Sequence, residues 1–293
     1  MTDAATALAY SHCEQVTRTR ARNFYYGIRL LPRAKRQALC AVYAWSRLCD
    51  DAVDGPADGG APARLDAVRR VLERAHAEGY AQDPDPVVHA LGDAIRRFRL
   101  PLEPFAAILR GMEMDLRGVR YESFPQLRHY CECVAGAVGR LCLEIFGYTH
   151  PDAPDLGVEM GIALQLTNVL RDLREDVGLG RVYLPREEIE AAGYSVEDLR
   201  ALRRTPSFDR LMAQQVARAR AYYERSERLF SMVVADARLC LMVLHGIYRE
   251  LLASIESSGY DVMTQRVRVP TRRKVQLIGT LLLRNRQVRA GRA

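Results

Sequence analysis

Lysine, tryptophan and long hydrophobic runs are almost missing from this chain of 293 residues. Lys35 and Lys274 are its only lysines, so nearly all of its positive charge comes from arginine. The longest apolar stretch, LCLMVLHGIY (239–248), is too short to span a bilayer. The N-terminus, MTDAATALAYSHCEQ, lacks the basic start and the apolar run of a secretion signal. We therefore expect a cytoplasmic protein without a membrane span.

Paired cysteine motifs are also missing. The chain has seven cysteines, an odd number, and Cys131 and Cys133 form only a C-x-C pair, a weak metal signal. The six histidines are scattered along the chain, so no His/Cys cluster indicates a zinc site. This pattern predicts reduced and mostly buried thiols.

The excess of positive charge does not indicate a nucleic-acid partner. The formal net charge is +7, but the arginines are spread along the chain. A nucleic-acid surface needs clustered basic residues interleaved with stacking aromatics. We therefore expect no nucleic-acid partner.

Helical periodicity runs along nearly the whole chain. Apolar residues recur at i, i+3 and i+4 in segments such as LCAVYAWSRLCDDAVD and RLMAQQVARARAYYERSERLFSMVV. Breakers such as GPADGGAP (55–62) and AQDPDP (81–86) separate these segments, and the best strand pattern, QRVRVP (265–270), is short. No linker or repeat divides the chain. We predict an all-α fold, a single domain over residues 1–293 with long helices around a common interior.

Two rows of polar residues interrupt this apolar pattern. Gln165, Asn168, Asp172 and Asp176 are spaced by three, four and four residues, which places them on one helix face. Apolar residues flank the row on both sides, so it is not a plain solvent-facing surface. A similar row, Tyr43, Arg47, Asp50 and Asp54, occurs earlier, with Asp51 displaced from its line.

One acidic row alone is most simply an exposed helix end, because like charges at i, i+4 cost only about 0.2–0.5 kcal/mol on a surface. Two rows on largely apolar helices suggest a shared cavity, where converging carboxylates need a positive partner. Arg47 and Arg171 are near, but Mg²⁺ fits better, because it prefers oxygen ligands and binds carboxylates together with substrate phosphates.

A diphosphate bound in this way inside an apolar helical bundle predicts a particular chemistry. The metal neutralises the leaving diphosphate, so that a carbon–oxygen bond can ionise. The allylic cation that results has to be shielded from water and stabilised by groups such as aromatic faces.

Five segments together resemble the squalene/phytoene synthase family of head-to-head prenyl transferases. The resemblance covers about residues 12 to 286. NFYYGIRLLP (23–32) is similar to the family's N-terminal substrate segment, and YAWSRLCDDAVD to its first aspartate-rich motif. YCECVAGAVG (130–139) resembles its central Tyr/Gly helix. QLTNVLRDLREDVGLGRVYLP (165–185) is similar to its second aspartate-rich signature, and YDVMTQRVRVPTRRK (260–274) to its closing segment.

The resemblance implies an isoprenoid-synthase helical bundle with a central cavity, a cluster of Mg²⁺ ions, for which Mn²⁺ is a substitute, and prenyl diphosphate substrates. It implies metal ligation and catalysis by carboxylates on two walls, with Tyr183 near the ionising centre. Substrate contacts are implied for a second set of residues. The metal set is Asp50, Asp54, Asn168, Asp172 and Asp176, and the substrate set is Arg22, Tyr43, Arg47, Gln165, Arg171, Tyr248 and Arg266. Ala21 and Asn23 depart from the small hydroxyl residues that the family often carries there.

The resemblance also implies the reaction, the joining of two identical allylic diphosphates at their C1 ends. We interpret the chain as a C15 enzyme, which converts two farnesyl diphosphates through presqualene diphosphate to a squalene-type product. The alternative is a phytoene synthase that condenses two geranylgeranyl diphosphates. NADPH stays open, because no G-x-G-x-x-G follows a strand here and the family can bind it without that motif.

Rival functions and further partners follow from the same residues. A terpene cyclase usually has an N-S-E-type second motif, whereas this chain has D-L-R-E-D. A non-catalytic assembly protein of the same fold would have lost motif carboxylates, and here they are present. The segment VQLIGTLLLRNR (275–286) predicts a terminal core helix, with peripheral contact to the inner face of the membrane as the alternative. Downstream isoprenoid enzymes are a further partner class that the resemblance allows.

Overall fold

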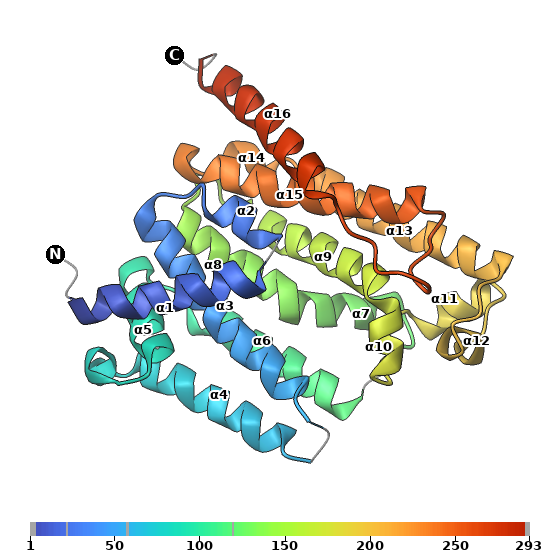
Figure 1. Cartoon of the computed structure of the whole chain (residues 1–293), viewed down its shortest axis with the longest axis horizontal. Helices are drawn as coiled ribbons and strands as arrows, with labels where there is room; N and C mark the ends of the chain where they lie inside the picture. Colours follow the sequence, from blue (N-terminus) through green and yellow to red (C-terminus); the bar gives the residue numbers. More distant parts are fainter. Residues whose placement is uncertain (1–3, 22, 57–58, 119, 291–293) are drawn as a thin grey trace.

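A helical bundle forms the described part of the chain. The structure is a computed structural model that describes residues 4–21, 23–56, 59–118 and 120–290. Within these ranges no β-strand forms, and a single antiparallel bridge joins Tyr148 to Val233. The all-α prediction is therefore confirmed. Figure 1 shows the long helices stacked side by side, with α16 projecting from the body.

The helices follow the breakers in the sequence. Their bounds are α1 Ala4–Arg20, α2 Phe24–Ile28, α3 Arg33–Val53, α4 Ala61–His76, the 3₁₀ turn η1 Glu78–Gln82, α5 Pro86–Phe98, α6 Leu102–Arg117, α7 Phe124–Cys131, the π-helical turn η2 Glu132–Gly136, α8 Ala137–Phe146, α9 Ala153–Arg171, α10 Leu173–Gly178, α11 Arg186–Ala191, α12 Val196–Arg200, α13 Pro206–Ser226, α14 Leu229–Met232, α15 Ala235–Ser257 and α16 Thr271–Ala290.

Local sequence explains where the helices that carry the two polar rows begin and end. Helix α3 starts after Pro32 and stops before Gly55-Pro56, and its apolar face buries Trp45 completely. Helix α9 ends at Arg171, because Asp172 has φ −96° and ψ 10°, and α10 starts at the next residue. The spacing of the second row predicts one straight helix. In the structure the row instead bends at Asp172.

Glycines bring α9 unusually close to α8 and to the π-helical turn η2 that precedes it. A Cβ on Gly161 would lie 2.3 Å from the carbonyl oxygen of Ala135, and a Cβ on Gly139 would lie 2.3 Å from that of Gly157. No side chain fits at such distances, so both contacts require glycine. The π-helical turn η2, which contains Ala135, leads directly into α8. Single π turns often occur at functional sites.

The C-terminal helix differs in part from its prediction. The segment 265–270, the best strand pattern of the sequence, forms no strand and lies in the connection between α15 and α16. Helix α16 packs on α15 through Leu277 and Leu281, which lie over Gly246, but Val275 and Leu283 on its other side are exposed. It is therefore only in part the core helix that the sequence predicts.

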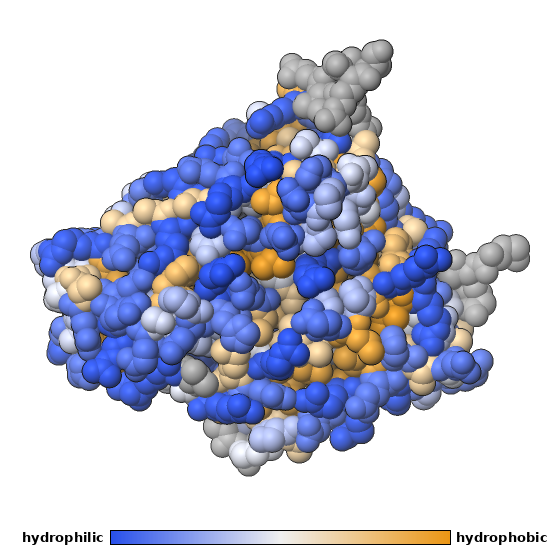
Figure 2. Space-filling model, turned by 180° about the vertical axis from the view of Figure 1, so that it is seen from behind, coloured by the Kyte–Doolittle hydropathy of each residue, from blue (hydrophilic) through white to orange (hydrophobic). Residues whose placement is uncertain are grey.

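Polar residues cover most of the surface. Seen from behind, hydrophilic side chains dominate the face, and apolar residues show in the gaps between them (Figure 2). The seven cysteines are free, and all but Cys142 are buried. No helix among the described residues has the length and apolar character needed to cross a membrane.

Candidate active site

One cavity of about 630 Å³ runs into the bundle between α3, α6, α8, α9 and α15. Its polar part is lined by aspartates and arginines, several of them from the two polar rows of the sequence. Its apolar part is lined by side chains such as Phe24, Ile28, Leu39, Phe146, Leu241 and Leu244. The cavity therefore combines a charged region with an apolar region, which suits a ligand that has both a charged and an apolar part.

Helix α3 supplies one polar wall. Tyr43, Arg47, Asp50 and Asp54 all line the cavity, whereas Asp51 does not. The Arg47 guanidinium lies 3.2 Å from the carboxylate of Asp50 and 3.3 Å from that of Asp51. The row that the sequence shows on this helix therefore faces inward, with an arginine paired to its carboxylates.

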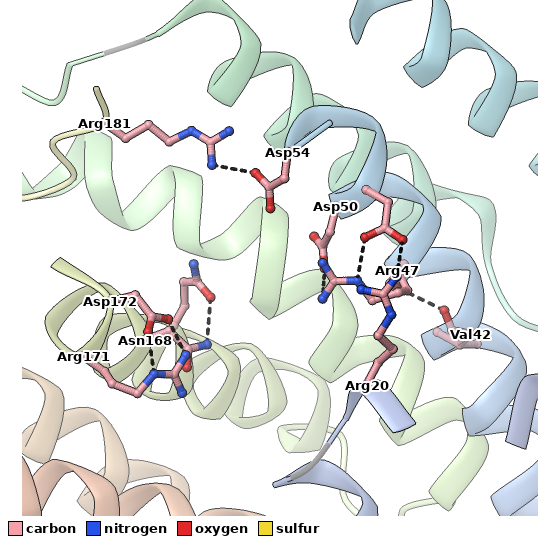
Figure 3. A network of polar contacts seen from close by, with 12 residues as sticks. Arg20, Val42, Arg47, Asp50, Asp54, Asn168, Arg171, Asp172 and Arg181 are labelled. Carbon is pink, nitrogen blue, oxygen red and sulfur yellow. Dashed lines mark hydrogen bonds and ion pairs between the residues drawn. The ribbon is translucent and has the colours of Figure 1, made fainter. Parts of the chain in front are cut away.

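Helix α9 supplies the opposite wall. Gln165, Asn168, Arg171 and Asp172 line the same cavity. The Nδ2 of Asn168 donates to Gln165 Oε1 over 3.4 Å, and Arg171 makes a two-pronged contact with the Asp172 carboxylate. Figure 3 shows Asp50 and Asp54 facing Asn168 and Asp172 across open space.

Two further arginines reach into the space between the walls. Arg181 Nη1 lies 2.9 Å from Asp54, and Arg266 Nη2 lies 2.7 Å from Asp172. Arg181 follows α10, and Arg266 comes from the segment after α15. Figure 3 shows Arg181 reaching toward Asp54 from the left. Arg174 on α10 holds that segment by donating to the Thr264 carbonyl over 2.7 Å.

Burial and repulsion change the acidity of two carboxyl groups. Burial raises the pKa of Asp50 to about 6, with Arg47 opposing the shift and Asp54 adding to it. Burial also raises the pKa of Asp176 to about 7, and the nearby carboxylates of Asp172 and Asp115 contribute. Carboxyl groups with a raised pKa inside a cleft are typical of functional sites.

Asp176 does not line the main cavity. Because the chain bends at Asp172, Asp176 lies in a small adjoining pocket, together with Arg181 and Tyr183. It remains close enough to Asp172 for their charges to interact.

Sequence reasoning missed Asp115, which joins two tyrosines in the cavity. The Tyr183 hydroxyl donates to Asp115 over 2.7 Å, and the Tyr130 hydroxyl donates over 2.9 Å. The two rings stack with centroids 5.1 Å apart. The sequence does contain a sign of this role. Asp115 follows Ile108 and Met112 on the apolar face of α6, and a carboxylate on an apolar helix face is unusual.

Tyr248 of the predicted substrate set does not line the cavity. Tyr248 is buried beside the cavity, where it hydrogen-bonds Arg171 and its ring lies 5.4 Å from that of Phe24. Arg22 lies outside the described residues. Arg181, which sequence reasoning did not select, lines the cavity and lies within the second aspartate-rich signature (165–185).

The donor atoms fit Mg²⁺ held jointly with a ligand. Among the described residues, no three His, Cys, Asp or Glu side chains already form a metal site. This agrees with carboxylates divided between two walls, since Mg²⁺ usually takes one or two carboxylates and completes its shell with water and phosphate. The Oδ1 of Asn168 is buried and has no hydrogen-bond partner, so it is free to ligate a cation.

Comparison with known proteins gives a consistent result. The model of the squalene/phytoene synthase family matches residues 17–273. A 15-cis-phytoene synthase from Synechococcus elongatus is 40% identical over 96% of this chain and 94% of its own. A phytoene synthase from Mycobacterium tuberculosis is 40% identical over 94% and 90% of the two chains.

Solved structures agree with the fold. A dehydrosqualene synthase matches with a TM-score of 0.85 at 29% identity, over 96% of this chain and 98% of its own. A squalene synthase from Alicyclobacillus acidocaldarius matches with a TM-score of 0.79 at 34% identity, over 87% and 95% of the two chains. The chain belongs to the squalene/phytoene synthase family and is a prenyltransferase of the head-to-head type.

Proposed function

We propose that this enzyme condenses two molecules of geranylgeranyl diphosphate head to head into a phytoene-type C40 product. The observation that carries this proposal is the similarity to phytoene synthases at 40% identity over almost the full length of both chains. The sequence motifs alone favoured the C15 donor and left C20 as the alternative. The relatives support that alternative.

The polar walls are suited to hold the diphosphate groups. Asp50, Asp54, Asn168 and Asp172 would bind Mg²⁺, with Asp176 behind them. Bound Mg²⁺ supplies the Lewis acid that neutralises a leaving diphosphate. Four arginines in the same space, Arg47, Arg171, Arg181 and Arg266, can bond diphosphate oxygens with their planar forks.

The apolar part of the cavity is suited to hold the prenyl chains and to exclude water. Its lining of Ile28, Leu39, Leu241 and Leu244 offers no nucleophile to an allylic cation. The stacked rings of Tyr130 and Tyr183 line the same cavity, where their aromatic faces can stabilise a cation. Asp115 accepts hydrogen bonds from both hydroxyls, so both hydroxyl protons point to this carboxylate.

A second candidate is the squalene-type C30 reaction. It is supported by the similarity to a dehydrosqualene synthase and a squalene synthase structure, at 29% and 34% identity. The geometry of the polar walls serves both reactions, because the diphosphate is common to both donors.

Product analysis distinguishes the candidates. Purified protein with Mg²⁺ is incubated with farnesyl or geranylgeranyl diphosphate, with and without NADPH, and the extract is measured by mass spectrometry. We expect a C40 hydrocarbon from geranylgeranyl diphosphate whose yield does not depend on NADPH. A C30 product as the main outcome would replace this proposal with the second candidate. The Asp172→Asn variant serves as the inactive control.

A further inference from the structure

The positive charge of this protein is concentrated in its last 32 residues. The chain up to Asp261 contains 34 basic and 36 acidic residues, so it is close to neutral. The residues after Asp261 contain nine basic side chains and no acidic one. The whole excess of +7 therefore comes from residues 262–293, most of which form α16 and the segment that leads into it. A segment of this kind attracts an anionic surface.

Helix α16 has two apolar sides, and α15 covers only one of them. Leu277 and Leu281 are four residues apart and pack over Gly246 of α15. Val275, Gly279 and Leu283 are also spaced by four residues, but they lie on the opposite side of the helix. A Cβ on Gly279 would meet nothing within 4 Å. The outer side therefore faces away from the body. Figure 1 shows that α16 as a whole projects from the bundle.

The outer side exposes large apolar side chains between arginines. Val275 is 58% exposed, Leu282 37% and Leu283 63%. The other large apolar residues with comparable exposure, Leu8, Leu102 and Leu179, lie on different elements. Arg268, Arg272 and Arg284 are exposed in or beside α16. Exposed leucines flanked by basic residues on one helix are typical of a helix that lies at a membrane interface.

We propose that α16 docks the enzyme onto a lipid bilayer that contains anionic phospholipids. The positive segment complements the negative charge of the lipid headgroups, and the leucines enter the boundary between headgroups and acyl chains. An acidic protein would satisfy the arginines as well, but the exposed leucines and Val275 favour a bilayer, which offers both an anionic and an apolar layer.

The start of α16 is attached to a wall of the cavity. Lys274 Nζ donates to Asn23 Oδ1 over 2.7 Å and lies 5.2 Å from the centre of the Tyr26 ring. Asn23 and Tyr26 belong to the α2 segment, whose Phe24 lines the apolar part of the cavity. A bilayer bound by α16 would therefore lie close to α2, which lines the apolar part of the cavity.

Vesicle sedimentation with the full-length protein tests the proposal. The protein is mixed with vesicles of phosphatidylcholine alone, or of phosphatidylcholine with phosphatidylglycerol, and the bound fraction is measured against lipid concentration. We expect binding to the anionic vesicles only, and a marked loss of it in 1 M salt, where the screening length falls to about 3 Å.

Two double variants separate the contributions of charge and apolar surface. Arg272→Gln with Arg284→Gln should weaken binding by about 30-fold, because each basic residue near an anionic surface contributes a factor of about five. Leu282→Ser with Leu283→Ser should also weaken binding. The matched controls are Arg70→Gln with Arg200→Gln, and Leu8→Ser, which change exposed residues on other helices.

Turnover of detergent-dispersed substrate should be equal in the wild type, the variants and the controls, since none of these residues lines the cavity. The proposal is wrong if the wild type does not bind anionic vesicles, or if the controls weaken binding as much as the α16 variants. Binding to an acidic protein partner without any binding to vesicles would also overturn it.

Discussion

Replacing Asp176 by asparagine should stabilise the protein in the absence of Mg²⁺ although it damages the site. Burial raises the pKa of Asp176 to about 7, and the carboxylates of Asp172 and Asp115 add to the shift. The ionised form of Asp176 is therefore unfavourable in the folded protein. An asparagine side chain has nearly the same shape and carries no charge, so the substitution removes this repulsion.

The magnitude and its dependence on pH follow from the raised pKa. Between pH 4 and pH 7 the folded state holds a proton that the unfolded state has lost, so the free energy of unfolding falls as pH rises through this window. An ordinary value of 3.8 raised to about 7 corresponds to at most about 4 kcal/mol. Because the Asp176 side chain is only half-buried, solvent screens part of this unfavourable interaction. We expect the substitution to raise the free energy of unfolding by about 1–2 kcal/mol at pH 8.

Thermal unfolding followed by circular dichroism measures the effect. At pH 8 with EDTA, we expect the Tm of Asp176→Asn to exceed that of the wild type by about 2–6 °C, and the difference should shrink at pH 5. Glu224→Gln, which removes an exposed carboxylate on α13, is the matched control and should change little. Mg²⁺ with inorganic diphosphate should raise the Tm of the wild type more than that of the variant. A variant that is less stable than the wild type at pH 8 would refute the reasoning.

Three other outcomes are expected. Asp54→Asn or Asp172→Asn should lower turnover by about a hundredfold or more while the helical circular dichroism spectrum stays unchanged; full activity in either variant would exclude its role at the metal. EDTA should abolish product formation in the mass-spectrometric assay, and Mg²⁺ or Mn²⁺ should restore it; undiminished turnover with EDTA would contradict the mechanism. Gly161→Ala should lower the free energy of unfolding by about 1–3 kcal/mol, because its Cβ would lie 2.3 Å from the Ala135 carbonyl oxygen. An unchanged urea midpoint would show that α9 and the π-helical turn η2 can move apart at no cost.

The sequence was sufficient to predict the helical class and the two polar rows, because both depend on local spacing. A row at intervals of three and four residues faces one way on any regular helix, whatever the rest of the fold does. The bend at Asp172 was not predictable in the same way. It changes the direction of the chain by one residue's dihedral angles and moves Asp176 into a pocket of its own.

Residues that act through long-range contacts were harder to find. Asp115 is 68 positions away from Tyr183 in the chain, and their hydrogen bond exists only because α6 and the segment after α10 meet at the cavity. Arg181 likewise reaches Asp54 across 127 positions. A periodicity argument considers one helix at a time, so it shows that a side chain faces inward but not which partner it meets there.

The arginines explain why opposing walls can carry so many carboxylates. Arg47 pairs with Asp50, Arg181 with Asp54, and Arg171 and Arg266 with Asp172, so each of these carboxylates has a positive neighbour. A guanidinium bonds a diphosphate oxygen with the same fork that it uses for a carboxylate. If Mg²⁺ were held beside these carboxylates, the same guanidinium groups would be available to bond the diphosphate. We therefore expect these arginines to neutralise the carboxylates in the free protein and the diphosphate in the complex.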